Sequence, residues 1–207
     1  MSSTQQTTNG RVWPELPLAL LEAVRDQDRP VEILEAEDLS ASLPRRFGLS
    51  GVVSSQIQRY EAAVSSGTRV PVTELVSLLQ LVLRRPDGAT IVREMGRRVT
   101  RQRVGERVPF SARLVRRSAT LVFGPIRRRA KRLLRGMIGS GRLEMAGKPL
   151  TVRITPAFTA DLGSGACVLY TGALEELIRI YSGKERRVVH SSCTAQGDTR
   201  CEWSVED

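Results

Sequence analysis

The only cysteines and the only histidine of this chain lie close together near the C-terminus, at Cys167, His190, Cys193 and Cys201. Three thiolates and one imidazole can complete the tetrahedral shell of a structural zinc ion. Two other interpretations stay open from residue types alone. The thiols can be buried as small apolar side chains beside a surface histidine, or Cys193 and Cys201 can form a cross-strand disulfide.

The spacing of these residues constrains the elements that hold them. Cys193 and Cys201 are equally far from Gly197, so a turn centred on Gly197 brings the two thiols face to face across a hairpin. His190 is an odd number of residues from Cys193 and points to the opposite face of a regular strand. A bulge at Ser191-Ser192 is needed to bring the imidazole to the thiols.

The rest of the C-terminal half alternates apolar and polar residues as strands do. We expect Cys167 to arrive on a buried strand, Ala166–Tyr170, which must neighbour the final hairpin. A helix begins after Thr171 and ends at Gly183. The other expected strands span residues 142–145, 150–155, 185–193 and 200–205.

The N-terminal half has helical periodicity instead. A polar, disordered tail is expected at residues 1–12 and a helical region at 13–105. Residues 106–207 then form the second unit, which begins with two helical pieces separated at Pro125. The predicted fold class is therefore α+β, a helical N-terminal half followed by a mostly antiparallel β-β-β-α-β-β sheet domain.

A family resemblance gives these elements a context. The segments ACVLYTGALEE at 166–176, VHSSCTAQGD at 189–198 and CEW at 201–203 resemble the 4-vinyl reductase domain family, which includes the sensory domains of phenol- and xylene-responsive bacterial activators. The match covers roughly residues 110–207. It implies a fold related to the tethering subunits of transport-protein-particle complexes and to haem-nitric-oxide-binding domains. It also implies a structural zinc held by Cys167, His190, Cys193 and Cys201, with His190 in place of the family's glutamate.

The same resemblance implies a cavity for a small hydrophobic ligand beside the zinc. Six aromatic residues are the candidates to line it, although they can equally be ordinary core: Phe110, Phe123, Phe158, Tyr170, Tyr181 and Trp203. Trp203 shares a strand face with Cys201 and Val205 by alternation, which favours burial.

Composition and motifs narrow the function classes. The net charge of +10 comes mainly from arginine, and the cluster at 127–135 favours a solvated helix face over a phosphate-binding surface. No nucleotide-binding or nucleophile-elbow motif is present, so we expect no enzyme. The start of the chain does not have the pattern of a secretory signal, and no apolar run reaches the length of a membrane span, which predicts a cytoplasmic protein.

The expected function is therefore a non-enzymatic sensory or regulatory domain with a structural zinc, binding a small hydrophobic ligand and acting through a homodimer or a protein partner. The alternative is a structural or assembly subunit, and a basic nucleic-acid-binding protein is the third, least favoured class.

Overall fold

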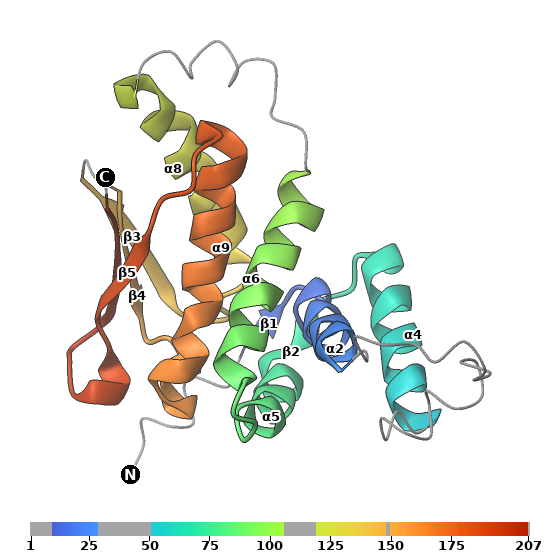
Figure 1. The fold of residues 1–207 in the computed structure, drawn as a ribbon. Helices are drawn as coiled ribbons and strands as arrows, with labels where there is room; N and C mark the ends of the chain where they lie inside the picture. The colour runs from blue at the N-terminus through green and yellow to red at the C-terminus, as the bar shows by residue number, and fades with distance from the viewer. Residues whose placement is uncertain (1–9, 29–50, 106–118, 148–149, 207) are drawn as a thin grey trace.

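The protein has an α+β fold, as the sequence predicts, with helices concentrated in the N-terminal half and most strands in the C-terminal part (Figure 1). The computed structural model describes residues 10–28, 51–105, 119–147 and 150–206. Its helices and strands follow in the order β1 (Arg11–Val12), α2 (Glu15–Gln27), α4 (Gly51–Ser66), β2 (Val70–Pro71), α5 (Val72–Val82), α6 (Gly88–Val104), α8 (Ala119–Arg135), β3 (Arg142–Ala146), β4 (Thr151–Thr155), α9 (Ser164–Ser182), β5 (Val188–Ser192) and β6 (Cys201–Val205). Two short 3₁₀ helices lie at Phe158–Leu162 and Thr194–Gln196.

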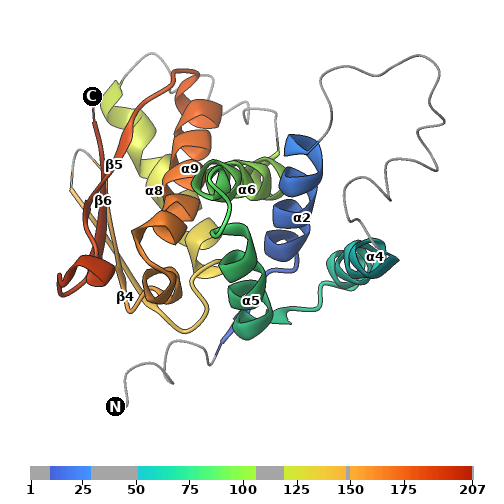
Figure 2. The ribbon, with the colours of Figure 1, turned by 60° about the horizontal axis from the view of Figure 1, so that its bottom comes forward.

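The main sheet is antiparallel and has the strand order β3-β4-β6-β5. Val152 pairs with Trp203 and Ile154 pairs with Cys201, so four buried side chains from the two central strands share one face. This face is covered by α8 and α9, which lie side by side against it (Figures 1 and 2). The sheet therefore has a buried face that carries Cys201 and Trp203.

Close packing of α6 on α9 joins the two halves of the chain. A Cβ added to Gly96 would lie 2.1 Å from the carbonyl oxygen of Leu169, and one added to Gly172 would lie 2.1 Å from that of Arg93. Thr100 is fully buried at the same crossing, and its hydroxyl donates to the carbonyl oxygen of Ala173 at 3.1 Å. The residues of both halves belong to one apolar core, with α2 on the far side of α6 and α4 beyond α2 (Figure 2).

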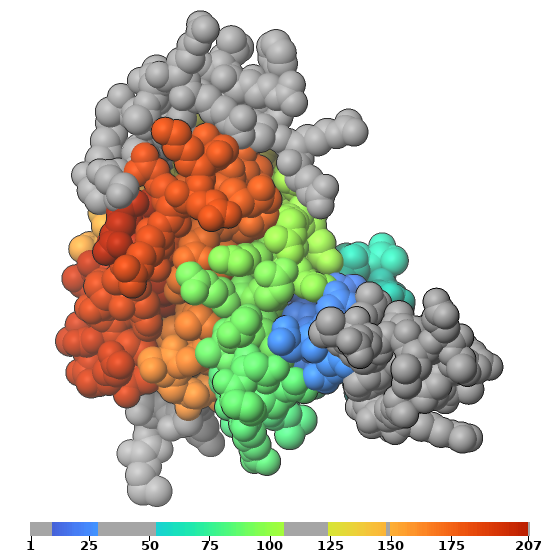
Figure 3. All heavy atoms as spheres, in the orientation of Figure 1, coloured from blue at the N-terminus to red at the C-terminus, as the bar shows by residue number. Residues whose placement is uncertain are grey.

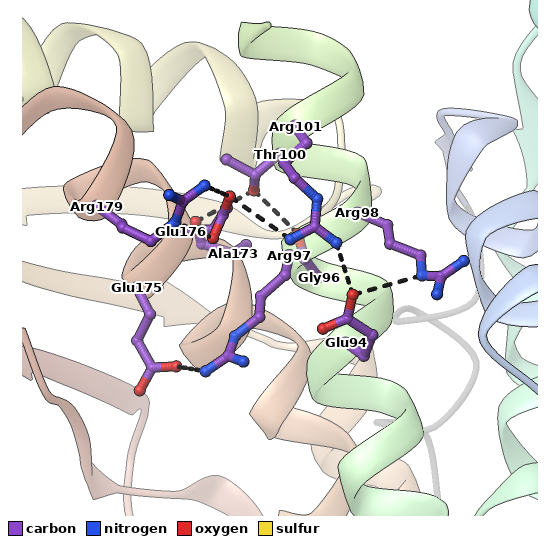
Figure 4. A network of polar contacts seen from close by, with 10 residues as sticks. All are labelled: Glu94, Gly96, Arg97, Arg98, Thr100, Arg101, Ala173, Glu175, Glu176 and Arg179. Atoms are coloured by element: carbon purple, nitrogen blue, oxygen red, sulfur yellow. Dashed lines mark hydrogen bonds and ion pairs between the residues drawn. The ribbon is translucent and has the colours of Figure 1, made fainter. Parts of the chain in front are cut away.

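Charged groups surround this crossing (Figure 4). Glu175 of α9 receives hydrogen bonds from Arg93 and Arg97 of α6. Glu176 is bonded by Arg179 at 2.5 Å and lies 3.6 Å from Arg101. Because nearly buried carboxylates are costly unless paired, these arginines satisfy a requirement of the helix packing.

The predicted strand Ala166–Tyr170 is wrong. These residues lie in the first turns of α9, a 19-residue helix with 14 buried residues. Because the helix is buried on nearly all sides, its apolar residues do not mark out one face. A short apolar run of this kind is compatible with either a buried strand or a buried helix. Thr171 consequently lies inside the helix and does not begin it.

Two further differences concern segment limits. Arg11 and Val12, assigned to the disordered tail, form β1 and pair with β2, and Val12 is fully buried; the rest of the predicted tail up to residue 9 lies outside the described residues. Pro125 does not separate two helices but lies inside α8. Among the described residues, no helix is both long and apolar enough to cross a membrane.

Candidate metal centre

The four residues singled out by the sequence converge in the structure. One potential ligand atom from each of Cys167, His190, Cys193 and Cys201 lies within 4.8 Å of all the others. Cys167 comes from the first turn of α9, His190 from β5, Cys193 from the end of that strand and Cys201 from the start of β6. The site thus joins the helix to the final hairpin.

The sulfur separations match a tetrahedral metal site. The Sγ atom of Cys193 lies 4.0 Å from that of Cys167 and 3.9 Å from that of Cys201. Two sulfurs at about 2.3 Å from one zinc ion and at the tetrahedral angle lie about 3.8 Å apart. A disulfide requires about 2.05 Å, and all three cysteines are free thiols in the structure.

A β-bulge brings the imidazole of His190 to this site, as the spacing predicts. His190 pairs with Trp203, but Ser192 pairs with Glu202, so Ser191 is the extra residue on β5. The shift puts His190 on the face of Trp203, the same face to which Cys201 points. The Nε2 atom of His190 is buried and has no hydrogen-bond partner among the described residues, which suits a metal ligand.

The loop between the two strands is built to hold Cys193. The backbone carbonyl of Cys193 accepts hydrogen bonds from the amides of Gln196 and Asp198, at 2.8 and 3.2 Å. In return, the carboxylate of Asp198 accepts a hydrogen bond from the Cys193 amide at 2.7 Å. Gly197 has a φ of 96°, which a residue with a side chain rarely adopts, and so it allows the chain to turn back.

Two threonines contact the sulfur atoms. Thr194 approaches the Sγ atom of Cys201 with both its amide, at 3.5 Å, and its hydroxyl, at 3.4 Å. The hydroxyl of Thr159, from the 3₁₀ helix before α9, lies 3.3 Å from the Sγ atom of Cys167. Groups of this kind orient metal ligands and balance thiolate charge. Thr159, Thr194 and Asp198 were not predicted as part of the site. Thr194 and Asp198 could have been found from their position in the loop between Cys193 and Cys201, whereas Thr159 lies far from the hairpin in the sequence.

The thiols do not ionise alike. The pKa of Cys201 is lowered to about 3, first because the Cys167 thiol donates a hydrogen bond to it, and then because of hydrogen bonds with His190 and with the side chain and amide of Thr194. The pKa of Cys167 is raised, because its proton is held by Cys201 and because it is buried. Burial also raises the pKa of Cys193. Cys201 is therefore the thiol that loses its proton most readily, and coordination by all three cysteines would release protons from the other two.

The donor set fits zinc. Thiolate and imidazole ligands favour zinc over hard cations such as magnesium, which prefer oxygen. With four protein ligands, the coordination shell would be complete and would leave no position for a substrate. This arrangement is that of a structural site, because a catalytic zinc needs an open position.

Four of the six predicted pocket residues are described, and all four are buried in the core: Phe158, Tyr170, Tyr181 and Trp203. Trp203 contacts Tyr170 edge to face at a ring-centroid distance of 5.2 Å. Phe110 and the side chain of Phe123 lie outside the described residues. Tyr170 and Trp203 thus form a packed aromatic cluster beside the metal site, where Trp203 also stacks on His190.

A surface hollow lies elsewhere, beside the α6–α9 crossing. It has a volume of about 650 Å³ and is lined only by arginine and glutamate residues, among them Arg93, Glu175 and Arg187. The space-filling view shows α6 and α9 adjoining along this face (Figure 3). Its charged lining does not suit the apolar ligand that the resemblance implies.

Comparisons with known proteins add no identity: no family model, no curated protein and no solved structure matches the chain.

Proposed function

We propose that the chain is a non-enzymatic regulatory domain of the 4-vinyl reductase type, with a structural zinc site and a small hydrophobic ligand. The observation that carries the proposal is the convergence of Cys167, His190, Cys193 and Cys201, with their potential ligand atoms all within 4.8 Å of one another. The four residues come from the start of α9 and from the β5–β6 hairpin, so a metal ion would fix the position of the helix relative to the hairpin.

The aromatic cluster supports the ligand-binding part of the proposal. The Nε1 atom of Trp203 is buried and has no hydrogen-bond partner among the described residues, whereas the neighbouring Tyr170 hydroxyl is hydrogen-bonded to the side chain of Thr159. Buried polar atoms are nearly always bonded, so the indole N–H of Trp203 is a donor that a ligand could use. A small, mostly apolar molecule with one oxygen acceptor would fit this donor and the apolar walls around it.

A second candidate is an assembly subunit that acts through a homodimer or a protein partner. The packed state of the aromatic cluster favours it, because Trp203 and Tyr170 are completely buried without a ligand. Ligand binding requires Tyr170 and Trp203 to move apart and admit a molecule, whereas an assembly subunit keeps them packed. Both are consistent with a cytoplasmic location, where the three thiols stay reduced.

The test combines metal analysis with ligand titration. Protein purified without a histidine tag should contain one zinc ion per chain, and Cys193→Ser and Cys201→Ser should each lose it. Ser191→Ala, which removes an exposed hydroxyl next to the site, is the matched control and should keep the metal. Absence of stoichiometric zinc from the wild type would refute the metal site.

Ligand binding is tested with a Trp13→Phe variant, in which Trp203 is the only tryptophan. Phenol, as the probe, should quench the fluorescence of Trp203 saturably, because the ring is proposed to line the pocket. Tyr170→Phe removes the hydroxyl beside Trp203 and should weaken this binding. A zinc-containing protein without saturable quenching supports the assembly subunit instead.

A further inference from the structure

The C-terminal part of α8 carries a cluster of exposed positive charges on one side. We define the basic face of α8 as Arg127, Arg128, Lys131, Arg132 and Arg135, all exposed. At 100° per residue these five positions fall within an arc of about 140°. The opposite side of the helix carries Ile126, Ala130, Leu133 and Leu134, which are buried in the core.

The basic face differs from the arginine-rich α6 in the ion pairs that the described residues make. On α6, Arg98 pairs with Asp26 at 2.8 Å and Arg103 with Glu15 at 2.7 Å, and Arg93, Arg97 and Arg101 also have carboxylate partners. Within the described part of the chain, no residue of the basic face makes an ion pair or a side-chain hydrogen bond. Among the residues that the structure describes, these five cations thus gain nothing from ion pairs, and their mutual repulsion opposes the fold.

The net charge of the protein originates in the sequence around this helix. Residues 107–143 contain 11 arginines and lysines and no aspartate or glutamate. The rest of the chain has 21 basic and 22 acidic residues and a net charge of −1, so the whole excess of +10 comes from this one segment. A general basic composition does not explain such a local excess.

The shape of the basic face indicates the kind of polyanion. It extends from residue 127 to residue 135, about 12 Å along the helix axis. Over this length the two strands of duplex DNA present about seven phosphates, one per about 1.7 Å of axis, which is enough for five contacts. Four of the five cations are arginines, whose guanidinium groups bind phosphate oxygens in pairs. From Gly124 to Arg135 the helix has no aromatic residue on which single-stranded bases could stack.

A membrane surface fits these observations less well. A helix that binds in a lipid interface inserts its apolar side, but the apolar side of α8 already packs in the core through Ile126, Leu133 and Leu134. Only the charged groups remain for contact with a partner.

We propose that the basic face of α8 is a docking surface for the phosphate backbone of duplex DNA, bound without sequence specificity. This surface is separate from the metal centre and independent of the proposed ligand, so it can exist whether or not the chain binds zinc.

The test measures the salt dependence of binding. The full-length chain is titrated into a fluorescein-labelled duplex of about two helical turns between about 50 and 200 mM salt, with fluorescence anisotropy as the readout. With five phosphate contacts, log Kobs should fall with log[salt] at a slope of about −4.5, a loss of about 500-fold over this range. In the variant Arg127→Gln/Arg128→Gln/Lys131→Gln/Arg132→Gln, the slope should fall to about −0.9.

The control variant is Arg69→Gln/Arg84→Gln/Lys184→Gln/Arg187→Gln. It also replaces three arginines and one lysine, all at exposed positions outside α8, and so removes the same amount of charge. It should keep the wild-type slope. An equal loss in both variants would show that net charge alone drives binding and would overturn the proposal. Absence of wild-type binding near 50 mM salt would overturn it as well. So would binding through the basic face to phosphatidylserine vesicles or to single-stranded RNA in place of the duplex. Far- and near-ultraviolet circular dichroism of both variants checks that they are folded.

Discussion

The imidazole of His190 stacks on the indole of Trp203, with ring centroids 4.5 Å apart and planes inclined by 8°. The two residues are also direct partners in the register of β5 and β6. Trp203 in turn contacts Tyr170 of α9 edge to face. The imidazole of the candidate metal site is therefore held by an aromatic ring that itself packs against the helix carrying Cys167.

This stacking predicts that Trp203 tunes metal affinity without touching the metal. Trp203→Leu keeps an apolar side chain but removes the flat support of the imidazole, so the affinity for cobalt should fall about 10- to 100-fold. The thiolate-to-cobalt absorption bands provide the measurement. Val205→Ala, a buried change on the same face of β6, is the control: it should lower the melting temperature but leave cobalt affinity near the wild-type value.

Metal removal should destabilise the protein. A zinc chelator should lower the melting temperature of the wild type, and stoichiometric zinc should restore it, because binding energy at a structural site contributes to folding. Cys201→Ala should melt at a low temperature that the chelator does not change further. If chelation leaves the melting temperature of the wild type unaltered, no metal contributes to its stability.

Asp198 should matter although it is not a proposed ligand. Its carboxylate accepts a hydrogen bond from the Cys193 amide at 2.7 Å, and Asp198→Ala removes this charge-assisted bond from the hairpin loop. We expect a loss of about 1–3 kcal/mol in the free energy of unfolding and weaker cobalt binding. Thr199→Ala, at the next, exposed position, should have an effect within about 0.5 kcal/mol. Equal effects of the two changes would argue against a role for the carboxylate.

The crossing of α6 and α9 should not tolerate a methyl group. Gly96→Ala places a Cβ 2.1 Å from the Leu169 carbonyl oxygen, so the helices must separate, at a cost of about 1–3 kcal/mol. The matched change Gly165→Ala, in the first turn of α9, places its Cβ at an ordinary 3.7 Å from the Cδ2 atom of Leu83 and should instead stabilise by about 0.5–1 kcal/mol through helix propensity. Urea unfolding of both variants gives the comparison, and a neutral Gly96→Ala would mean that the helices can move apart freely.

Acid should weaken the same crossing through Glu176. Burial by itself raises the pKa of this carboxyl, but hydrogen bonds and charge from Arg179 and the charge of Arg101 outweigh it, and the pKa is lowered. Because the folded-state pKa lies below the unfolded value of about 4.3, the contribution is complete above that pH and is lost as the pH falls toward the folded value.

Glu176→Gln should therefore reduce the loss of stability between neutral pH and about pH 3, measured by chemical unfolding at each pH. Glu61→Gln removes an exposed carboxyl of α4 and serves as the control, with a pH profile like that of the wild type. A Glu176→Gln profile that follows the wild type would contradict the assignment.

The sequence determined the chemistry and the local geometry of the final hairpin. Gly197 marked the turn, equal spacing placed Cys193 opposite Cys201, and the odd spacing of His190 required a bulge, which the structure has at Ser191. These conclusions were reachable because a hairpin obeys a period of two over a few residues, so parity alone decides which side chains share a face.

Tertiary structure decided how the fourth ligand arrives. Residues 166–170 were predicted as a strand, yet they begin a helix buried between the sheet and α6. A segment covered on nearly all sides has no polar face to reveal its period, so its own sequence does not distinguish helix from strand. The same applies to Thr159, whose contact with Cys167 depends on how the 3₁₀ helix packs against the first turn of α9. Residue types and short spacing thus specified which four side chains could bind zinc, whereas the packing of α9 on the sheet determined that they meet.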